Sequence, residues 1–357
     1  MRFQWTLGAL LALPGFAVMA LATTPYAVSQ EIIEGHTTYH LTDSVRHMDV
    51  GVVPDMGNFV YQFKSHGKDV LIPPASFQDY LAKHWFCCGI PFLEPWANRI
   101  DKDYYYFEGK KYLLNDDLGT LLRLPDTHLV IHGLVVFDSR WKVVKTGASD
   151  AEGAFITSRL DFYKYPDLMA QFPFAHSIEI TYRLKDGKLQ NTTEVTNLSA
   201  AAMPVDFGYH PYLRPDGPRQ DWTVSIGARL HWIVDNYTHL IPTGETEPAE
   251  KFLPHAAQFK LAKTFLDDGF SSLVRDSRGL GHYWVKGKTE KIELVFSKEY
   301  NFGHVYAPLD NTLICLEPET GITNAFNLNH EGTFPSLIVL QPGKVFRATF
   351  WIVPTGF

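Results

Sequence analysis

The chain alternates between apolar and polar residues over many short segments, which is the pattern of half-buried β-strands. Turn residues separate these segments, the clearest of which are residues 155–162, 178–184, 189–195 and 230–234. Glu108-Gly109-Lys110 predicts a hairpin between residues 104–107 and 111–114. Pro342-Gly343 has the signature of a type II turn between residues 336–340 and 345–353.

Helical periodicity is almost absent, and residues 76–83 are the best candidate for a short helix. Turn signals recur every ten or so residues, which favours a large antiparallel β-sandwich over a parallel α/β sheet. The chain has no polar linker, no low-complexity tract and no clear internal repeat. We therefore expect one all-β domain over residues 31–357, preceded by a short segment over residues 23–30.

The N-terminus has the layout of a secretory signal sequence. Arg2 precedes an apolar run over residues 5–22, which ends in Ala20-Leu21-Ala22. A positive start, an apolar stretch and a small-x-small site predict cleavage after Ala22, so that residues 1–22 are removed. A retained membrane anchor is the alternative, but Pro14 weakens a helix that is already short for the ~17–25 residues of a span. We expect an exported protein, periplasmic or extracellular, with no membrane span after cleavage.

Composition narrows the possible partners. The 357 residues carry a net charge of −7 and contain no basic run, which argues against nucleic acid and anionic membrane surfaces. The three cysteines are few and odd in number, so they do not form a disulfide framework. Cys87 and Cys88 are adjacent and could pair only in a strained ring. We therefore expect Cys87, Cys88 and Cys315 to be buried small apolar residues.

The stretch MPVDFGYHPYLRP, residues 203–215, combines a core-forming face with a polar one. Strand alternation places Met203, Val205, Phe207 and Tyr209 on the apolar face, and Asp206, Gly208 and His210 opposite. Pro211 restricts His210 to extended conformations. A lone His-Pro-Tyr is more often a core histidine at a strand end, so its meaning depends on the other polar stretches.

Three other stretches carry candidate chemistry. LVIHGLVVFDSRW, residues 129–141, repeats the arrangement of an imidazole, His132, beside a glycine. GIPFLEPWANRI, residues 89–100, reads as a loop in which Asn98 and Arg99 supply fixed donors. Arg99 could also be structural, and Trp96 could be a sugar platform or, by default, a core residue.

The last stretch is LICLEPETGITNAFN, residues 313–327. Alternation puts Glu317 on the same face as Leu313 and Cys315. A carboxylate on an otherwise apolar strand is costly to bury unless it is hydrogen-bonded, so we expect its pKa to be tuned. Glu319 is the rival carboxylate, and we expect it to lie past Pro318 in a loop.

Taken together, these stretches resemble the aldose 1-epimerase (galactose mutarotase) family. The segments that carry the resemblance occur in family order over nearly the whole chain: GNFVYQFKSHGKDVLIPP, PWANRI, HG followed by W, FPF, HPY, LIPTGE, LEPETGITNAFN and FPSLIVLQPGKVF. No single one is specific, whereas their order is. The resemblance implies a large antiparallel β-sandwich whose concave face binds a free aldose.

The resemblance also implies roles for three catalytic residues. Glu317 matches the general base that takes the proton from the anomeric hydroxyl. His210 matches the general acid that protonates the ring oxygen. His132 matches a second histidine that assists at the ring oxygen or binds a hydroxyl. A carboxylate and an imidazole can perform both proton transfers near neutral pH, so no metal, nucleotide or other cofactor is required.

Further positions are implied in sugar binding. Arg99 matches the sugar-binding arginine, and Asp267 matches the aspartate that holds sugar hydroxyls, with Asp268 as the alternative. Asn98 and Trp96 are further candidate contacts. The expected partner is a free monosaccharide such as galactose or glucose, although the bulky residues after His132-Gly133 leave the preferred aldose open.

Other functions remain compatible with the sequence. A glycoside hydrolase or lyase on a similar sandwich would need two carboxylates, with Glu94 or Asp267 beside Glu317. A non-catalytic sugar-binding or sensing module could share the fold. A phosphosugar epimerase would need a cationic phosphate pocket. Accelerated mutarotation of fresh α-glucose or α-galactose would distinguish an aldose 1-epimerase from these alternatives.

Overall fold

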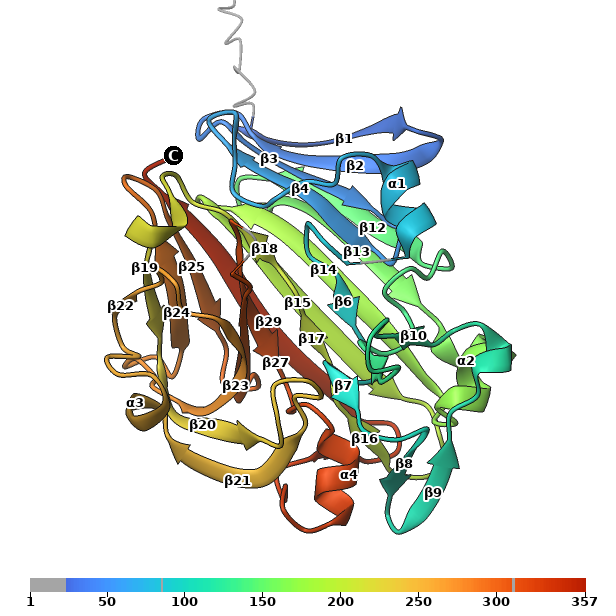
Figure 1. The fold of residues 1–357 in the computed structure, drawn as a ribbon. Helices are drawn as coiled ribbons and strands as arrows, with labels where there is room; N and C mark the ends of the chain where they lie inside the picture. Colours follow the sequence, from blue (N-terminus) through green and yellow to red (C-terminus); the bar gives the residue numbers. More distant parts are fainter. Residues whose placement is uncertain (1–23, 85, 310–311) are drawn as a thin grey trace, which may run out of the picture.

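A computed structural model of the protein describes residues 24–84, 86–309 and 312–357. The expected signal sequence over residues 1–22 lies outside the described residues. No helix in the described part of the chain has both the length and the apolar character needed to cross a membrane. Two large antiparallel sheets dominate the fold, as Figure 1 shows, and the predicted β-sandwich is confirmed.

The larger sheet has nine strands, and its long central strands run diagonally through the view of Figure 1. In spatial order these are β12 (Lys142–Ser149), β13 (Gly153–Leu160), β14 (His176–Lys185), β15 (Lys188–Asn197), β29 (Val345–Thr355), β25 (Lys291–Phe296), β24 (Gly281–Lys286), β19 (Thr223–Ile226) and β22 (Phe259–Lys260). Alternation in β14 explains its place: Ile178, Ile180, Tyr182 and Leu184 are fully buried, while the residues between them are not.

The second sheet has eight strands, and two of the residues predicted for the site, Asp267 and Glu317, lie on its strands. In spatial order these are β21 (Pro242–Pro248), β20 (Ala228–Val234), β23 (Leu266–Leu273), β26 (Phe302–Ala307), β27 (Ile314–Glu319), β17 (Gly208–Tyr209) and β6 (Phe92–Leu93), with β18 (Tyr212–Leu213) also paired to β27. The sheets meet through the core, where the Tyr209 ring lies 5.0 Å from that of Phe350 and its hydroxyl 2.5 Å from Oγ1 of Thr193.

Smaller sheets complete the molecule. A five-stranded sheet, at the top of Figure 1, contains β1 (Tyr26–Ile33), β2 (His36–Asp43), β3 (Met48–Val53), β4 (Phe59–Ser65) and β5 (Lys68–Asp69). The others are β10 (Leu122–Arg123), β11 (Val130–Ile131) and β7 (Arg99–Ile100); β16 (Met203–Val205) with β28 (Ile338–Leu340); and β8 (Tyr104–Phe107) with β9 (Lys110–Leu113). The last pair is the hairpin predicted around Gly109.

Helices in the described residues are short. They are α1 (Phe77–Lys83), α2 (Pro166–Gln171), α3 (Ala249–Phe252) and α4 (Ala325–His330), with 3₁₀ turns at Asp116–Leu118, Phe162–Lys164 and Arg219–Asp221. The helix predicted over residues 76–83 is confirmed as α1. Ser76 caps it by accepting a hydrogen bond from the backbone N–H of Asp79 at 3.0 Å.

Three details of the sequence prediction were wrong. The domain begins before residue 31, because β1 starts at Tyr26 and pairs along its whole length with β2. The strand expected through residues 203–209 is divided into β16 and β17, which pair with different neighbours. Glu319 does not lie in a loop, because β27 continues through Pro318 and Glu319 pairs with both Gly208 and Phe302.

Candidate active site

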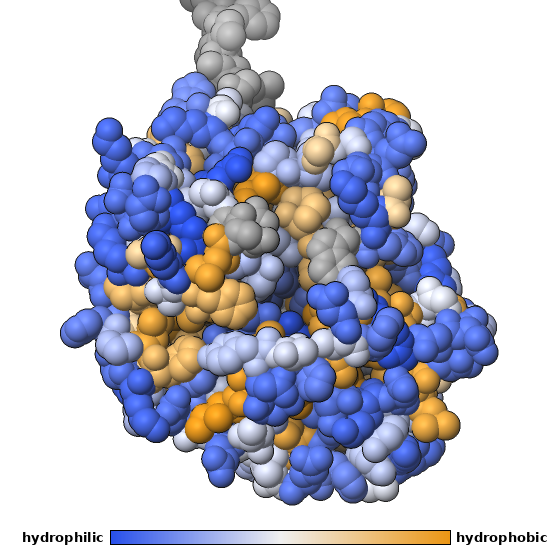
Figure 2. Space-filling model, in the orientation of Figure 1, coloured by the Kyte–Doolittle hydropathy of each residue, from blue (hydrophilic) through white to orange (hydrophobic). Residues whose placement is uncertain are grey.

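A cavity of about 510 Å³ opens on the second sheet and is lined by six of the seven residues predicted for the site. These six are Asn98, Arg99, His132, His210, Asp267 and Glu317. Figure 2 shows the molecule hollowed on this face, with hydrophilic residues at the bottom of the hollow. The volume lies within the ~300–1,000 Å³ range of small-molecule sites.

His210 reaches the cavity because β17 presents its two sides to different surroundings. Tyr209 points into the core, and His210, the next residue, lies on the opposite side, where its backbone N–H donates to Pro91 O at 3.1 Å. Gly208 fits a tight space beside it, since a Cβ there would lie only 3.0 Å from Cγ of Glu319 and 3.1 Å from Cβ of Ala97. The glycine therefore lets β17 approach β27.

Glu317 lies in the middle of β27, directly opposite His304 of β26. Its Oε1 atom is 3.3 Å from Nε2 of His210. Burial raises the pKa of Glu317 well above its usual value, with further contributions from the nearby Glu319 and Asp267 carboxyls. Burial also lowers the pKa of His210 to about 3. These surroundings therefore favour a protonated Glu317 beside a neutral His210.

Arg99, Asp267 and His304 form a hydrogen-bonded chain on the cavity wall. Nη2 of Arg99 donates to Oδ2 of Asp267 at 3.0 Å, and Nε2 of His304 lies 2.8 Å from Oδ1. These partners hold the pKa of Asp267 well below its usual range despite its burial. Asp267 is thus an ionised carboxylate whose two oxygens are already engaged.

A small sheet brings His132 next to Asn98 and Arg99. Ile131 of β11 pairs with Arg99 of β7, and the backbone N–H of His132 donates to Asn98 O at 2.9 Å. Gly133 has a φ of 71°, and a Cβ there would lie 2.1 Å from the carbonyl oxygen of Glu94. The His-Gly pair is therefore a tight turn that only glycine permits at its second position.

The cavity contains buried polar atoms that need partners. Among the described residues, these atoms have no hydrogen-bond partner: Oε2 of Glu317, Nδ1 of His210, Nδ1 of His132 and Nε of Arg99. Burial lowers the pKa of His132 well below its usual value, so both histidines are neutral here. Because buried polar groups are normally hydrogen-bonded, this arrangement fits a polar, hydroxyl-rich ligand.

Trp96 is the one predicted site residue that the structure places elsewhere. Its side chain is fully buried in the main hydrophobic core and is not among the residues that line the cavity. Its ring centroid lies 6.4 Å from that of Tyr105. The proposed sugar platform is therefore wrong, because the indole has no face open to a ligand.

Sequence reasoning missed His304, Tyr212 and Tyr306, all of which line the cavity. The sequence signal that could have found His304 is strand alternation in β26: Phe302, His304 and Tyr306 share one face of the strand, and the buried Val305 lies on the other face. Its importance depends on its register with Glu317, which the sequence does not display. Tyr212 stacks on His210, with ring centroids 4.6 Å apart.

Strand alternation in β23 places Asp267 and Asp268 in different surroundings. Asp267 lines the cavity, whereas Asp268 is fully buried and lies 3.0 Å from Nε2 of His231. Glu319 is also turned away from the main cavity, toward a small chamber that it shares with Asp267 and His304.

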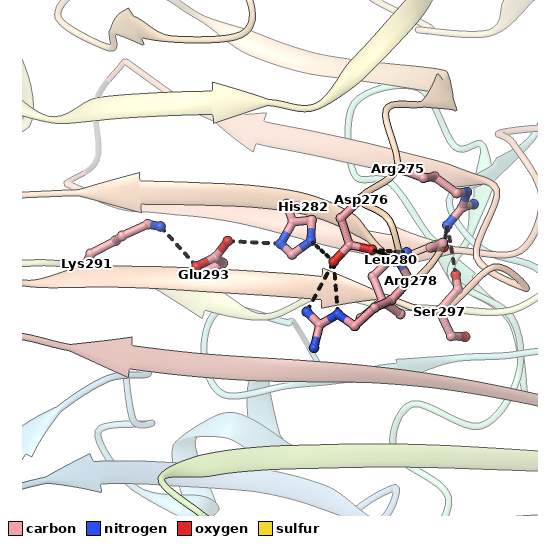
Figure 3. Close-up of polar contacts among 9 residues, drawn as sticks. Arg275, Asp276, Arg278, Leu280, His282, Lys291, Glu293 and Ser297 are labelled. Atoms are coloured by element: carbon pink, nitrogen blue, oxygen red, sulfur yellow. Dashed lines mark hydrogen bonds and ion pairs between the residues drawn. The ribbon is translucent and has the colours of Figure 1, made fainter.

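A second cluster of charged side chains lies away from the cavity, on β24, β25 and the segment before them (Figure 3). His282 bridges Glu293 at 3.0 Å and Asp276 at 3.4 Å, and Arg278 closes the chain on Asp276. All of these side chains are paired with one another, so the cluster reads as a surface ion-pair network. Among the described residues, no three His, Cys, Asp or Glu side chains are arranged to hold a metal ion.

Comparison with known proteins places the fold. The family model described as aldose 1-epimerase matches residues 40–352. YihR, an uncharacterized protein of Escherichia coli strain K12, is 24% identical over 264 residues, which cover 72% of this chain and 76% of that protein.

Solved structures show the same architecture. A galactose mutarotase-like protein from Clostridium acetobutylicum superposes with a TM-score of 0.79 at 22% identity, covering 93% of this chain and 99% of that one. Galactose 1-epimerase from Lactobacillus acidophilus superposes with a TM-score of 0.71 at 15% identity, with the same two coverages. At these identities the likeness concerns the fold.

Proposed function

This chain belongs to the aldose 1-epimerase family, and from that membership we propose that it interconverts the α and β anomers of a free aldose. The observation that carries the proposal is the contact between Glu317 and His210, 3.3 Å apart in a cavity with unsatisfied polar atoms. A base and an acid in contact with one bound sugar are the two groups that ring opening requires.

The pair needs one proton, shared between the two groups. Opening a pyranose ring removes a proton from O1 and delivers one to O5. Before the sugar binds, the shared proton stays on Glu317, because burial disfavours the charged form of each group. Sugar hydroxyls that donate to the Glu317 carboxylate stabilise its ionised form and so favour transfer of the proton to His210.

In this proposal, the ionised Glu317 then takes the O1 proton while the imidazolium of His210 protonates O5. The C1–O5 bond breaks, and the open-chain aldehyde forms. Rotation about C1–C2 presents the other face of the carbonyl to O5. Ring closure by the reverse transfers gives the opposite anomer and restores both side chains, so the reaction is an isomerisation with no net change in the enzyme.

The remaining polar residues would hold the sugar. Arg99 and Asp267 are fixed against each other, and Asn98 accepts a hydrogen bond from Nη1 of Arg99 at 2.7 Å. Such a pre-formed network can orient hydroxyls without ordering on binding. His132 and His304 are the further candidates for hydroxyl contacts, since both line the cavity.

Glycoside hydrolysis is the competing enzymatic reading. A protonated Glu317 and an ionised Asp267 have the pKa separation of an acid and a nucleophile. However, Oδ1 and Oδ2 of Asp267 already accept bonds from His304 and Arg99, which leaves the carboxylate poorly placed to attack a sugar. Sugar binding without chemistry is the other alternative.

Polarimetry, a reducing-sugar assay and a binding measurement distinguish the three functions. Purified protein is added to freshly dissolved α-galactose, α-glucose and a panel of other aldoses, and the rate of change in optical rotation is compared with that in buffer. Acceleration supports the proposal. Release of reducing sugar from glycosides would support hydrolysis, and binding without acceleration would support the non-catalytic reading.

We also propose that the protein is exported. The support is the layout of residues 1–22, with Arg2, an apolar run and Ala20-Leu21-Ala22. Intact-mass analysis of the protein from its native source should give a chain that begins at or near Thr23. A chain that retains Met1 in a membrane fraction would contradict cleavage.

A further inference from the structure

Two adjacent cysteines lie at the edge of the sugar cavity. Cys87 is exposed and lines the cavity, whereas Cys88 is 1% exposed. Their Sγ atoms are 3.2 Å apart, so the two thiols are already in contact. The expectation that Cys87 is a buried apolar residue was therefore wrong, and the pair needs another explanation.

The segment that carries these cysteines also supports the two histidines of the cavity. The ring of Phe86 lies 4.3 Å from that of His132 and 5.8 Å from that of His210. The Tyr212 hydroxyl donates to Phe86 O at 2.9 Å, and its backbone N–H donates to Gly89 O at 3.0 Å. Because Tyr212 also stacks on His210, the backbone on both sides of Cys87-Cys88 is connected to the catalytic imidazole.

The two thiols differ in the way that an attacking and a resolving cysteine differ. The hydrogen bond between the two sulfurs lowers the pKa of the Cys87 thiol, and the Lys83 ammonium lowers it further. The same hydrogen bond and burial raise the pKa of Cys88. Cys87 is thus the exposed sulfur with the greater thiolate character, which is the form that attacks disulfides.

We propose that Cys87 and Cys88 form a reversible oxidation site at the rim of the sugar cavity, with a low-molecular-weight disulfide as the oxidant. The Cys87 thiolate attacks one sulfur of the oxidant, which gives a mixed disulfide and releases one thiolate. Cys88 then loses its proton and attacks the Cys87 sulfur, which closes a Cys87–Cys88 disulfide and releases the second thiolate. Two electrons pass from the cysteine pair to the oxidant, which leaves as two thiols.

Closure constrains the peptide between the two cysteines in an eight-membered ring. The segment from Phe86 to Gly89 must adjust, and with it the support of His132 and His210. A displacement of about 1 Å at a catalytic group can cost on the order of 10²-fold in rate. Ring strain also makes the disulfide easy to reduce, so the modification is reversible.

The chemical part of the proposal can be tested without any activity. The protein is incubated with oxidised glutathione, quenched with acid, denatured and alkylated, and the peptide containing residues 87 and 88 is examined by mass spectrometry. We expect a peptide lighter by two hydrogen atoms with no alkylation, and its conversion to a doubly alkylated peptide after dithiothreitol. Stable glutathione on Cys87 with an alkylated Cys88, or two alkylated cysteines, would overturn the proposal.

Single variants separate the two roles. C88S should accumulate the glutathione adduct on Cys87, because the resolving thiol is absent. C87S should give no adduct, because Cys88 is buried. Cys315 is 0% exposed and should be alkylated after denaturation in every sample, which provides an internal control. An adduct on Cys88 in C87S would contradict the assigned roles.

The effect on the sugar site rests on the proposed function, and its readout is separate. Oxidised wild type should lose roughly 10- to 100-fold in kcat/KM for an accepted aldose and recover it with dithiothreitol. Adducted C88S shows whether blocking Cys87 alone has the same effect. A disulfide that forms without any change in kcat/KM would refute the coupling to the histidines. If the protein accepts no aldose, the mass measurement still decides whether the oxidation site exists.

Discussion

Nε2 of His210 lies 3.3 Å from Oε1 of Glu317, and the two side chains are only 6% and 1% exposed. Neighbouring strands produce this contact, since β17 pairs with β27 at Gly208 and Glu319, and His210 leaves the sheet two residues later. Nδ1 of His210 and Oε2 of Glu317 have no protein partner among the described residues. The pair is therefore free to exchange protons with a bound hydroxyl.

Loss of either proton-transfer group should abolish most of the activity. Glu317→Gln keeps the shape of the side chain but removes its basicity, and His210→Ala removes the acid. We expect each to lower kcat by roughly 10²–10⁴-fold, the range of one general acid or base. Polarimetry measures the rate, and circular dichroism and thermal unfolding establish that the variants fold. Near-wild-type mutarotation by Glu317→Gln would refute the assigned mechanism.

The ionic pair between Arg99 and Asp267 should act on binding. Asp267→Asn weakens a charged hydrogen-bond network that faces the cavity, and Arg99→Ala removes its donor. Loss of one hydrogen bond to a charged group costs roughly 1.5–3 kcal/mol, which corresponds to about a 10- to 100-fold rise in KM. The split between KM and kcat, obtained from initial rates over a range of sugar concentrations, checks this expectation.

Asp268 is the matched control for Asp267. It is adjacent in β23 but faces His231, 3.0 Å away, with no contact to the cavity. Asp268→Asn should leave KM near the wild-type value while lowering the free energy of unfolding. A large KM effect from Asp268→Asn, with none from Asp267→Asn, would contradict the assignment of Asp267 to the sugar.

Trp96 should matter for stability alone. It is fully buried in the main core, and substitution of a core Trp by Ala typically lowers the free energy of unfolding by about 3–5 kcal/mol. Trp96→Phe should cost less and leave KM unchanged. Urea unfolding and the KM of the folded Trp96→Phe protein measure the two effects. A rise in KM without loss of stability would restore the sugar-platform reading.

Much of the fold was predictable because strand alternation and turn residues are local signals. The hairpin around Gly109 and the helix capped by Ser76 followed directly from such signals. The break between β16 and β17 did not, because it depends on which distant strands each half pairs with. The prediction that the strand ends at Pro318 was wrong for the same reason, because pairing partners on both sides keep Glu319 in the strand.

Most of the candidate site was predicted through family resemblance, and the errors have a physical cause. Trp96 and Asn98 lie two residues apart in one loop, yet only Asn98 lines the cavity. His304 carries no motif and enters the site through its register with Glu317 and its contact with Asp267. Which loop residue turns inward, and which strand positions face one another, are tertiary properties that a single sequence does not reveal.

Glu319 should make stability depend on pH. Burial raises its pKa well above the usual value, so the native state holds a proton that the unfolded chain loses above about pH 4.3. Its contribution is fully present below that pH and falls as the pH rises toward the native pKa, by up to about 1.4 kcal/mol per pH unit. Glu319→Gln cannot ionise, so its Tm should fall less between pH 5 and pH 8 than that of the wild type. Parallel Tm curves would contradict this account.

In the pH profile of kcat/KM, we expect the histidine to set the acid limb and the glutamate to set the alkaline limb, which is the reverse of the usual order. The active pair holds one proton, and kcat/KM reports the free enzyme. The pair gains a second proton, on His210, only as the pH falls through the His210 pKa of about 3. It loses its one proton, from Glu317, only when the pH reaches the raised pKa of Glu317. We therefore expect a broad plateau whose acid limb belongs to His210 and whose alkaline limb belongs to Glu317. Unperturbed groups would give limbs near pH 4.3 and 6.5 in the opposite order.

Spectroscopy of the free protein decides between these assignments. At pH 6, the infrared spectrum should contain a protonated-carboxyl band that disappears in Glu317→Gln, and the ¹⁵N shifts of His210 should be those of neutral imidazole. Because Glu319 is also protonated, its own band should remain in Glu317→Gln and disappear in Glu319→Gln. A charged His210 at pH 6, together with an ionised Glu317, would show that the cavity does not hold the pair in its neutral form. The limbs would then have to be reassigned to Glu317 on the acid side and His210 on the alkaline side.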